Sequence, residues 1–289
     1  MSPSVIGTTL LAMLAFAGNS VLCRLALSPD SSAIIDPASF SAIRLLSGAV
    51  TLLLIVLWRE RRLPPMAGSW GGAAALFVYL LGFSYAYVQL DTGVGALILF
   101  GVVQLVMLFA ALRAGHRLQL AEIAGLMLAL VGLLLLLLPG ATRPNLPGAL
   151  LMALAGAGWA LYSLAGRDAG APLLATWGNF MRALPLLGLL LVVPVFLPDQ
   201  PLRFNTAGVW LALASGSVTS ALGYAIWYRA LAGLKVTQAG VVQLSVPVLA
   251  ALGGVWFVGE ALSLRLILSG ALVLGGIYCV LQVRERRQA

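Results

Sequence analysis

Long apolar runs, separated by short groups of polar residues, dominate the chain. Each run is about 20 residues long, enough for a helix to cross roughly 30 Å of hydrocarbon. Residues 125–138 show no alternation of apolar and polar positions, so they predict a helix rather than a strand of a membrane barrel. The pattern predicts ten spans, over residues 4–27, 36–58, 69–90, 92–113, 117–138, 146–167, 172–196, 206–230, 236–258 and 263–283.

The connections between these spans are short. Asp91 and Thr92 form a tight turn between the third and fourth spans, which we therefore expect to be antiparallel neighbours. Lys235 marks a similar turn between the eighth and ninth spans. No connection is long enough to form a soluble domain.

Composition supports an all-α polytopic membrane protein, because 61% of the residues are hydrophobic and only 9% are charged. The net charge of +8 does not indicate a nucleic-acid partner, since basic residues of membrane proteins gather in cytoplasmic loops. With the N-terminus inside, the inner loops hold eleven Lys and Arg residues and the outer side holds four. We therefore expect both termini to be cytoplasmic, in a multi-pass protein of the cell membrane, as in a bacterial inner membrane.

The chain repeats itself after five spans. Residues 14–20 (LAFAGNS) match residues 154–160 (LAGAGWA), and the second and seventh spans each hold one arginine, Arg44 and Arg182. Because five is odd, the second copy starts on the opposite side of the membrane. The sequence thus predicts two inverted five-helix repeats, over residues 1–140 and 141–289. Such repeats are typical of secondary transporters, whose substrate site lies near the membrane midplane between the repeats.

Residues 247–276 (PVLAALGGVWFVGEALSLRLILSGALVLGG) resemble the C-terminal signature of EamA-type members of the drug/metabolite transporter superfamily. The aromatic–arginine pairs Phe40/Arg44 and Phe180/Arg182 fit the second-helix pattern of that family. One departure is His116, which stands where the family pattern has glutamate. The resemblance covers essentially the whole chain and implies a ten-helix transporter, most like the exporters of aromatic and neutral amino acids.

Polar and aromatic residues in the middle of the spans are the candidate substrate-binding residues. They concentrate in the first, third, fourth, sixth, eighth and ninth spans, whereas the other four spans are blander and are expected to form an outer scaffold. Each aromatic residue alone fits core packing as well as a cavity wall. The candidates are Asn19, Tyr79, Phe83, Phe100, Gln104, Trp159, Tyr162, Tyr224 and Gln243.

This set suits a bulky, largely apolar, net-neutral solute, because aromatic faces bind the body and amides both donate and accept hydrogen bonds. Phosphates need several basic groups, and Lys235 is the only lysine. The prediction is export of aromatic and other hydrophobic or neutral amino acids by a protein that contacts membrane lipid as a monomer, with a dimer as the alternative. Efflux of other metabolites or lipophilic drugs is the alternative function, and a non-transporting scaffold is a third.

An enzyme is not expected. The apolar spans hold no paired acids, no metal-ligand cluster and no Ser/His arrangement, so we expect neither catalytic residues nor a metal or cofactor. His116, the only histidine, is expected in a solvated loop.

For the charged residues near the spans we favour structural roles. Arg44 and Arg182 are expected to snorkel or to bind a loop carbonyl or a loop acid, with substrate-carboxylate binding as the alternative. Arg24 is expected to snorkel, and Glu260 and Glu122 to stabilise the N-termini of the last spans in their halves.

Three residues are candidate hinge or gating positions. Gly18 and Gly158 lie in the paired first and sixth spans. Pro247 lies within the ninth span, where it frees a backbone carbonyl and favours a kink.

Overall fold

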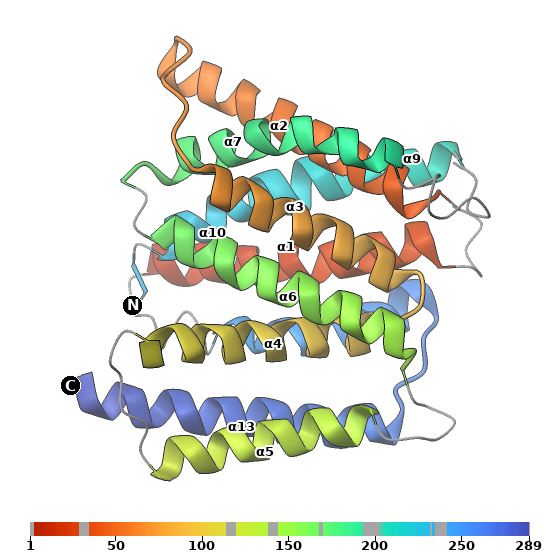
Figure 1. The fold of residues 1–289 in the computed structure, drawn as a ribbon, viewed down its shortest axis with the longest axis vertical. Helices are drawn as coiled ribbons and strands as arrows, with labels where there is room; N and C mark the ends of the chain where they lie inside the picture. Colours follow the sequence, from red (N-terminus) through yellow and green to blue (C-terminus); the bar gives the residue numbers. More distant parts are fainter. Residues whose placement is uncertain are drawn as a thin grey trace.

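In the computed structural model, the described residues are 3–28, 35–113, 120–137, 144–167, 170–192, 203, 205–231, 233–234 and 242–288, and all regular elements within them are helical. The first half of the chain contributes α1 (Pro3–Leu27), α2 (Pro37–Glu60), α3 (Trp70–Tyr87), α4 (Thr92–Arg113) and α5 (Leu120–Leu137), shown in Figure 1.

The second half contains helices that change type along their length. α7 continues as a 3₁₀-helix, and two other helices pass into π-helix, which is rare, occurs mostly as short segments inside α-helices and is frequent at functional sites. The elements are α6 (Leu146–Arg167), α7 (Pro172–Ala183), η1 (Leu184–Val192), α9 (Thr206–Ala214), η2 (Ser215–Leu222), α10 (Gly223–Leu231), α12 (Ser245–Gly253), η3 (Gly254–Val258) and α13 (Leu264–Gln288).

Each of the ten predicted spans contains helix. Among the described residues, seven helical stretches are long and apolar enough to cross a membrane, and three shorter apolar helices cover Ile123–Leu136, Ser245–Val258 and Leu264–Cys279. The chain is therefore a multi-pass helical membrane protein. The predicted turn at Lys235 lies outside the described residues.

The ends of α2 show how the sequence fixes a helix. The Asp36 carboxylate accepts a hydrogen bond from the Ser39 backbone nitrogen, and Pro37 occupies the first turn, where a missing N–H costs little. Arg61 ends the helix in the left-handed conformation, with φ 59°. Because both ends are defined, the register of α2 is fixed, and it places Arg44 in the interior.

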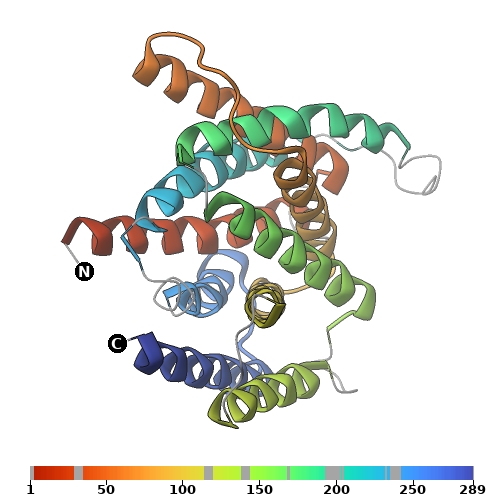
Figure 2. The same cartoon turned by 60° about the vertical axis from the view of Figure 1, so that its left-hand side comes forward.

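The helices form layers. α5 and α13 lie side by side along one edge of the molecule, and α2 and α7 lie at the opposite edge (Figures 1 and 2). α1, α3, α4, α6, α10 and α12 occupy the space between them. These six helices all belong to spans that were expected to be central.

One packing expectation was wrong. The tight turn at Asp91 and Thr92 is present, but α6 is the main partner of both α3 and α4. α3 and α4 are joined by the turn without forming a closely packed pair. The reason is that α6 has small residues on the faces that meet these two helices. A methyl group added at Gly156 would lie 2.7 Å from the Leu99 carbonyl oxygen of α4. One added at Gly158 would lie 2.8 Å from the Ala75 carbonyl oxygen of α3.

Each half makes an equivalent close contact with the other half. A methyl group added at Gly82 on α3 would lie 3.2 Å from Cβ of Ala155 on α6. One added at Gly223 on α10 would lie 2.9 Å from Cβ of Ala15 on α1. Gly82 and Gly223 are matched in the sequence repeat, and so are Ala15 and Ala155. The same close contact therefore occurs twice, with the halves exchanged.

The last helices of the two halves, α5 and α13, also make a matched pair of close glycine contacts. A methyl group added at Gly132 on α5 would lie 2.9 Å from Cγ2 of Val273 on α13, and one at Gly276 on α13 would lie 2.6 Å from the Ala129 nitrogen on α5. Here the matched positions, Gly132 with Gly276 and Ala129 with Val273, are 144 residues apart. The sequence repeat is thus also a repeat in packing.

The outer surface is apolar. Large side chains that are exposed in the isolated chain include Trp58, Trp210, Trp256 and Phe257. Exposed apolar side chains of this kind suit contact with lipid. In Figure 1, α1 begins and α13 ends on the same side of the helix layers, and α1 and α6 run in opposite directions.

Candidate functional site

Arg44 lies at the centre of a polar cluster inside the bundle. Its side chain is fully buried. Nε donates to the Ser220 hydroxyl at 3.0 Å, and Nη2 donates to the hydroxyls of Tyr79 at 3.2 Å and Tyr224 at 3.0 Å. The guanidinium carbon also lies 5.0 Å from the ring centroid of Phe83. α2, α3 and the η2–α10 helix therefore meet at this one cation.

The Tyr79 hydroxyl joins Arg44 to Asn19. The Asn19 side-chain nitrogen donates to it at 3.3 Å, and the Tyr224 hydroxyl lies 3.2 Å away and shares a hydrogen bond with it. The Asn19 oxygen accepts from the hydroxyls of Ser215 at 2.6 Å and Thr219 at 3.0 Å. The nitrogen and the oxygen of this buried side-chain amide thus both have hydrogen-bond partners, on α3 and on η2.

The π-helix η2 supplies the hydroxyls. An α-helix turns 100° per residue, and the wider π turn changes which side chains share a face. Within η2, Ser215 and Thr219 reach Asn19 while Ser220 reaches Arg44. One helical segment therefore serves both polar residues.

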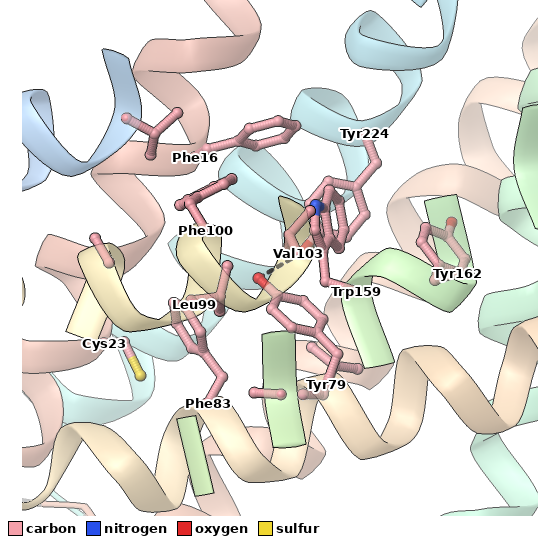
Figure 3. Packing of buried hydrophobic residues seen from close by; sticks show 14 of the residues in the cluster. Phe16, Cys23, Tyr79, Phe83, Leu99, Phe100, Val103, Trp159, Tyr162 and Tyr224 are labelled. Atoms are coloured by element: carbon pink, nitrogen blue, oxygen red, sulfur yellow. Dashed lines mark hydrogen bonds between the residues drawn. The ribbon is translucent and has the colours of Figure 1, made fainter. Parts of the chain in front are cut away.

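Aromatic rings pack beside this polar cluster, and Figure 3 shows several of them together with Tyr79 and Tyr224. The Trp159 ring lies 5.0 Å from that of Tyr79, 4.8 Å from that of Tyr224 and 5.4 Å from that of Phe16, measured between centroids. Tyr162 lies 5.7 Å from Trp159. These rings come from α1, α3, α6 and α10, so both halves of the chain build the cluster.

The structure brings most of the predicted binding residues together. Asn19, Tyr79, Trp159 and Tyr224 contact one another directly or through a shared partner, and Phe83 and Tyr162 each contact a member of this group. All nine are buried: Asn19, Tyr79, Phe83, Phe100, Gln104, Trp159, Tyr162, Tyr224 and Gln243. Phe100 and Gln104 lie on α4 and Gln243 lies just before α12, and their part in the site stays a prediction.

The expectation that Arg44 snorkels or binds a loop was wrong. Its guanidinium bonds to hydroxyls of three other helical residues and has no exposed surface. The sequence signal was a charge inside an apolar span, but its distance from the span end suggested an off-centre position. Sequence reasoning also missed Phe16 and the hydroxyls of Ser215, Thr219 and Ser220, although the small polar run SGSVTS was visible.

The structural interpretation of Arg182 is confirmed. Its Nη1 donates to the Ala67 carbonyl and to the Gly178 carbonyl, and Nη2 donates to the Met66 carbonyl at 3.3 Å. Arg182 therefore holds the α2–α3 connection against α7. The two arginines matched by the repeat have different surroundings.

Arg24 does not snorkel, contrary to expectation. Its Nε donates to the Glu260 carboxylate at 3.0 Å, and Nη2 lies 3.3 Å from the Asp91 carboxylate. Glu260 also accepts from the Thr92 backbone nitrogen at 2.9 Å and so stabilises the N-terminus of α4 rather than that of α13. At α13, the Ser263 hydroxyl accepts from the backbone nitrogen of Leu266 instead. His116 lies outside the described residues, as does the side chain of Glu122.

The candidate hinges differ in their packing. A methyl group at Gly158 would lie 2.8 Å from the Ala75 carbonyl oxygen, whereas one at Gly18 would meet only Cγ2 of Thr219, at 3.7 Å. Pro247 follows an interruption of the helix at Leu244 and cannot donate to the Gln243 carbonyl, as expected of a kink. Their role in gating stays a prediction.

The fold and this interior cluster define a polytopic membrane protein with a polar, aromatic-lined centre built by both halves of the chain. The model of the EamA-like transporter family matches twice, at residues 4–138 and 146–282. The chain belongs to the EamA-like transporter family and is a transporter, not an enzyme.

Its relatives agree with this class. An uncharacterized protein of Pseudomonas aeruginosa is 53% identical over 281 residues, which is 97% of this chain and 96% of the relative. The threonine/homoserine exporter RhtA of Escherichia coli is 32% identical over 138 residues, 45% of this chain and 44% of RhtA. A solved crystal structure covers 98% of both chains with a TM-score of 0.68 at 22% identity, and so shows the fold.

Proposed function

We propose that the chain exports aromatic and other hydrophobic or neutral amino acids across the cell membrane of a bacterium. The observation that carries this proposal is the composition of the central cluster. Asn19, Arg44 and Tyr79 come from the first half, Trp159 and Tyr224 from the second, and all are buried. A movement of one half against the other would separate the residues of this cluster, because both halves contribute to it.

The chemistry of the cluster supports such a solute. Ring faces from Phe16, Trp159 and Tyr224 suit an apolar body, and the amide, hydroxyl and guanidinium groups suit a polar end. Arg44 disfavours the alternative of lipophilic-cation efflux, because a buried guanidinium repels a cation. The relation to RhtA, a threonine/homoserine exporter, adds support for amino acids.

The proposed architecture is ten membrane-spanning helices in two inverted five-helix repeats, residues 1–140 and 141–289, with both termini cytoplasmic. The mirrored glycine contacts and the opposite directions of α1 and α6 support the inversion. The excess of Lys and Arg in the predicted inner loops supports the orientation. Inverted repeats with a site at their junction favour alternating access.

Transport by purified protein tests this function. Liposomes containing the protein are expected to accumulate labelled Phe, Trp, Thr or Met in counterflow. The Trp159→Ala variant is expected to lose a larger share of this transport than of its folded yield, because it removes a ring that contacts Tyr79, Tyr224 and Phe16. Failure of the folded wild-type protein to move any of the four amino acids would contradict the proposed substrate class.

A further inference from the structure

Arg44 is a buried cation without a buried anion. Among the described residues, ion pairs involve Arg24 and Arg59, not Arg44. The sequence has nine Asp and Glu residues, and none lies in the middle of an apolar span. A charge at this depth of a membrane protein is costly and marks a functional site by default. The tyrosine and serine hydroxyls around Arg44 are neutral partners, so they leave its charge uncompensated.

The same cluster has hydrogen-bond donors to spare. Within the described part of the chain, Nη1 of Arg44 and Nε1 of Trp159 are buried and have no hydrogen-bond partner. The Trp159 ring contacts the rings of both tyrosines that bind Arg44, so the two donors belong to one cluster. A buried donor without a partner costs free energy until an acceptor arrives.

The Tyr79 and Asn19 oxygens of the cluster, by contrast, are already engaged as acceptors. The Tyr79 hydroxyl oxygen lies within hydrogen-bond distance of three donor groups, those of Asn19, Arg44 and Tyr224. The Asn19 oxygen accepts from Ser215 and Thr219. An ammonium group would find few free lone pairs on these two oxygens and would be repelled by the guanidinium.

We propose that Arg44 anchors a carboxylate of the transported solute and that the carboxylate, not the amino group, is the polar group the site requires. This inference rests on the transport function proposed above and narrows it to organic carboxylates with an apolar or aromatic body. Arg44 binds the carboxylate through Nη1, because the planar guanidinium suits carboxylate oxygens. The rings of Trp159, Phe16 and Tyr224 then lie against the apolar body.

Three ligands that share one aromatic ring test this proposal. Binding of phenylalanine, 3-phenylpropionate and phenylalaninamide to the purified protein in detergent is measured by titration calorimetry, with protein-free micelles as the blank. Phenylalanine and 3-phenylpropionate are expected to bind with similar Kd. Phenylalaninamide, which keeps the amino group and lacks the carboxylate, is expected to bind about tenfold or more weakly, the loss expected for a charge-assisted hydrogen bond.

Variants locate the effect. Arg44→Gln is expected to remove the preference for the carboxylate ligands, and Arg44→Lys to restore part of it, because lysine keeps the charge but not the planar fork. Arg182→Gln is the matched control, since Arg182 is the repeat counterpart of Arg44 and binds backbone carbonyls. It is expected to leave the ligand preference unchanged. If Arg44→Gln does not fold, the three ligands on the wild-type protein still decide the question.

The outcomes separate this proposal from the proposed function. Equal binding of phenylalanine and phenylalaninamide overturns the carboxylate anchor and leaves amino-acid export standing. Binding of 3-phenylpropionate without phenylalanine supports the anchor and contradicts amino-acid export. Absence of binding by all three ligands contradicts both.

Discussion

At the scale of single residues, the Tyr79 hydroxyl links the polar side chains of the central cluster. Arg44, Asn19 and Tyr224 all contact it. Tyr79→Phe keeps the ring and removes this oxygen, leaving buried donors short of an acceptor. We expect a loss of about 1–3 kcal/mol in the free energy of unfolding.

Thermal unfolding in detergent measures this effect. Tyr278→Phe is the matched control, because Tyr278 lies on α13 and is 49% exposed. A Tm for Tyr79→Phe as high as that of the control would show that neighbouring hydroxyls replace the lost acceptor.

At this scale the sequence predicted the aromatic and amide members of the site but not its cation. Asn19 and Trp159 were found because the repeat pairs them and because both lie in the middle of apolar spans. Arg44 was misjudged because position along a span does not show which way a long side chain extends. The pairing with Arg182 strengthened the error, since matched positions have different partners in the two halves.

At the scale of helices, the small-residue face of α6 sets how closely it approaches α3. Gly158→Ala would place Cβ 2.8 Å from the Ala75 carbonyl oxygen and 3.0 Å from the Tyr79 nitrogen, so the backbones have to separate. We expect a loss of about 1–3 kcal/mol in stability, as for other overpacked sites.

The repeat provides the control for this substitution. Gly18 is the counterpart of Gly158, but its nearest neighbour is Cγ2 of Thr219 at 3.7 Å, an ordinary contact. Gly18→Ala is expected to change stability by less than about 0.5 kcal/mol. Equal losses of Tm for both variants would show that helix flexibility, rather than close packing, is what the two glycines provide.

The sequence predicted where the helices lie along the chain but not which helices pack against each other. Apolar runs of sufficient length require helix in a membrane, because the backbone must satisfy its own hydrogen bonds. The packing of α6 against both α3 and α4 depends on which faces hold glycine, and the chain order gave the wrong neighbour. The π-helix over Ser215–Leu222 is also invisible to a period of 3.6 residues, yet it directs the hydroxyls that reach Asn19 and Arg44.

At the scale of the whole molecule, the two ends of the bundle are held differently. Opposite the end where α1 begins, Arg24 of α1 joins Glu260 before α13 and Asp91 before α4. The repeat counterparts of Arg24 and Glu260 are Leu164 and His116, which form no Arg–Glu pair. The matched halves therefore share packing but not electrostatics, and the alternating access proposed above requires that these ion pairs separate when their end opens.

Glu260→Gln tests this requirement, because it removes the charge and keeps an oxygen for the Thr92 nitrogen. We expect the population in which this end is open to rise about tenfold, because the lost contact contributes ~1.5 kcal/mol.

The reactivity of Cys23 reports this opening, since Cys23 precedes Arg24 and is fully buried. Its reaction with a maleimide should accelerate in purified protein carrying Cys279→Ser, which removes the exposed thiol. Glu60→Gln, which removes an exposed charge near Arg59, is the matched control, and equal rates in both variants would show that the Arg24–Glu260 pair does not hold this end closed.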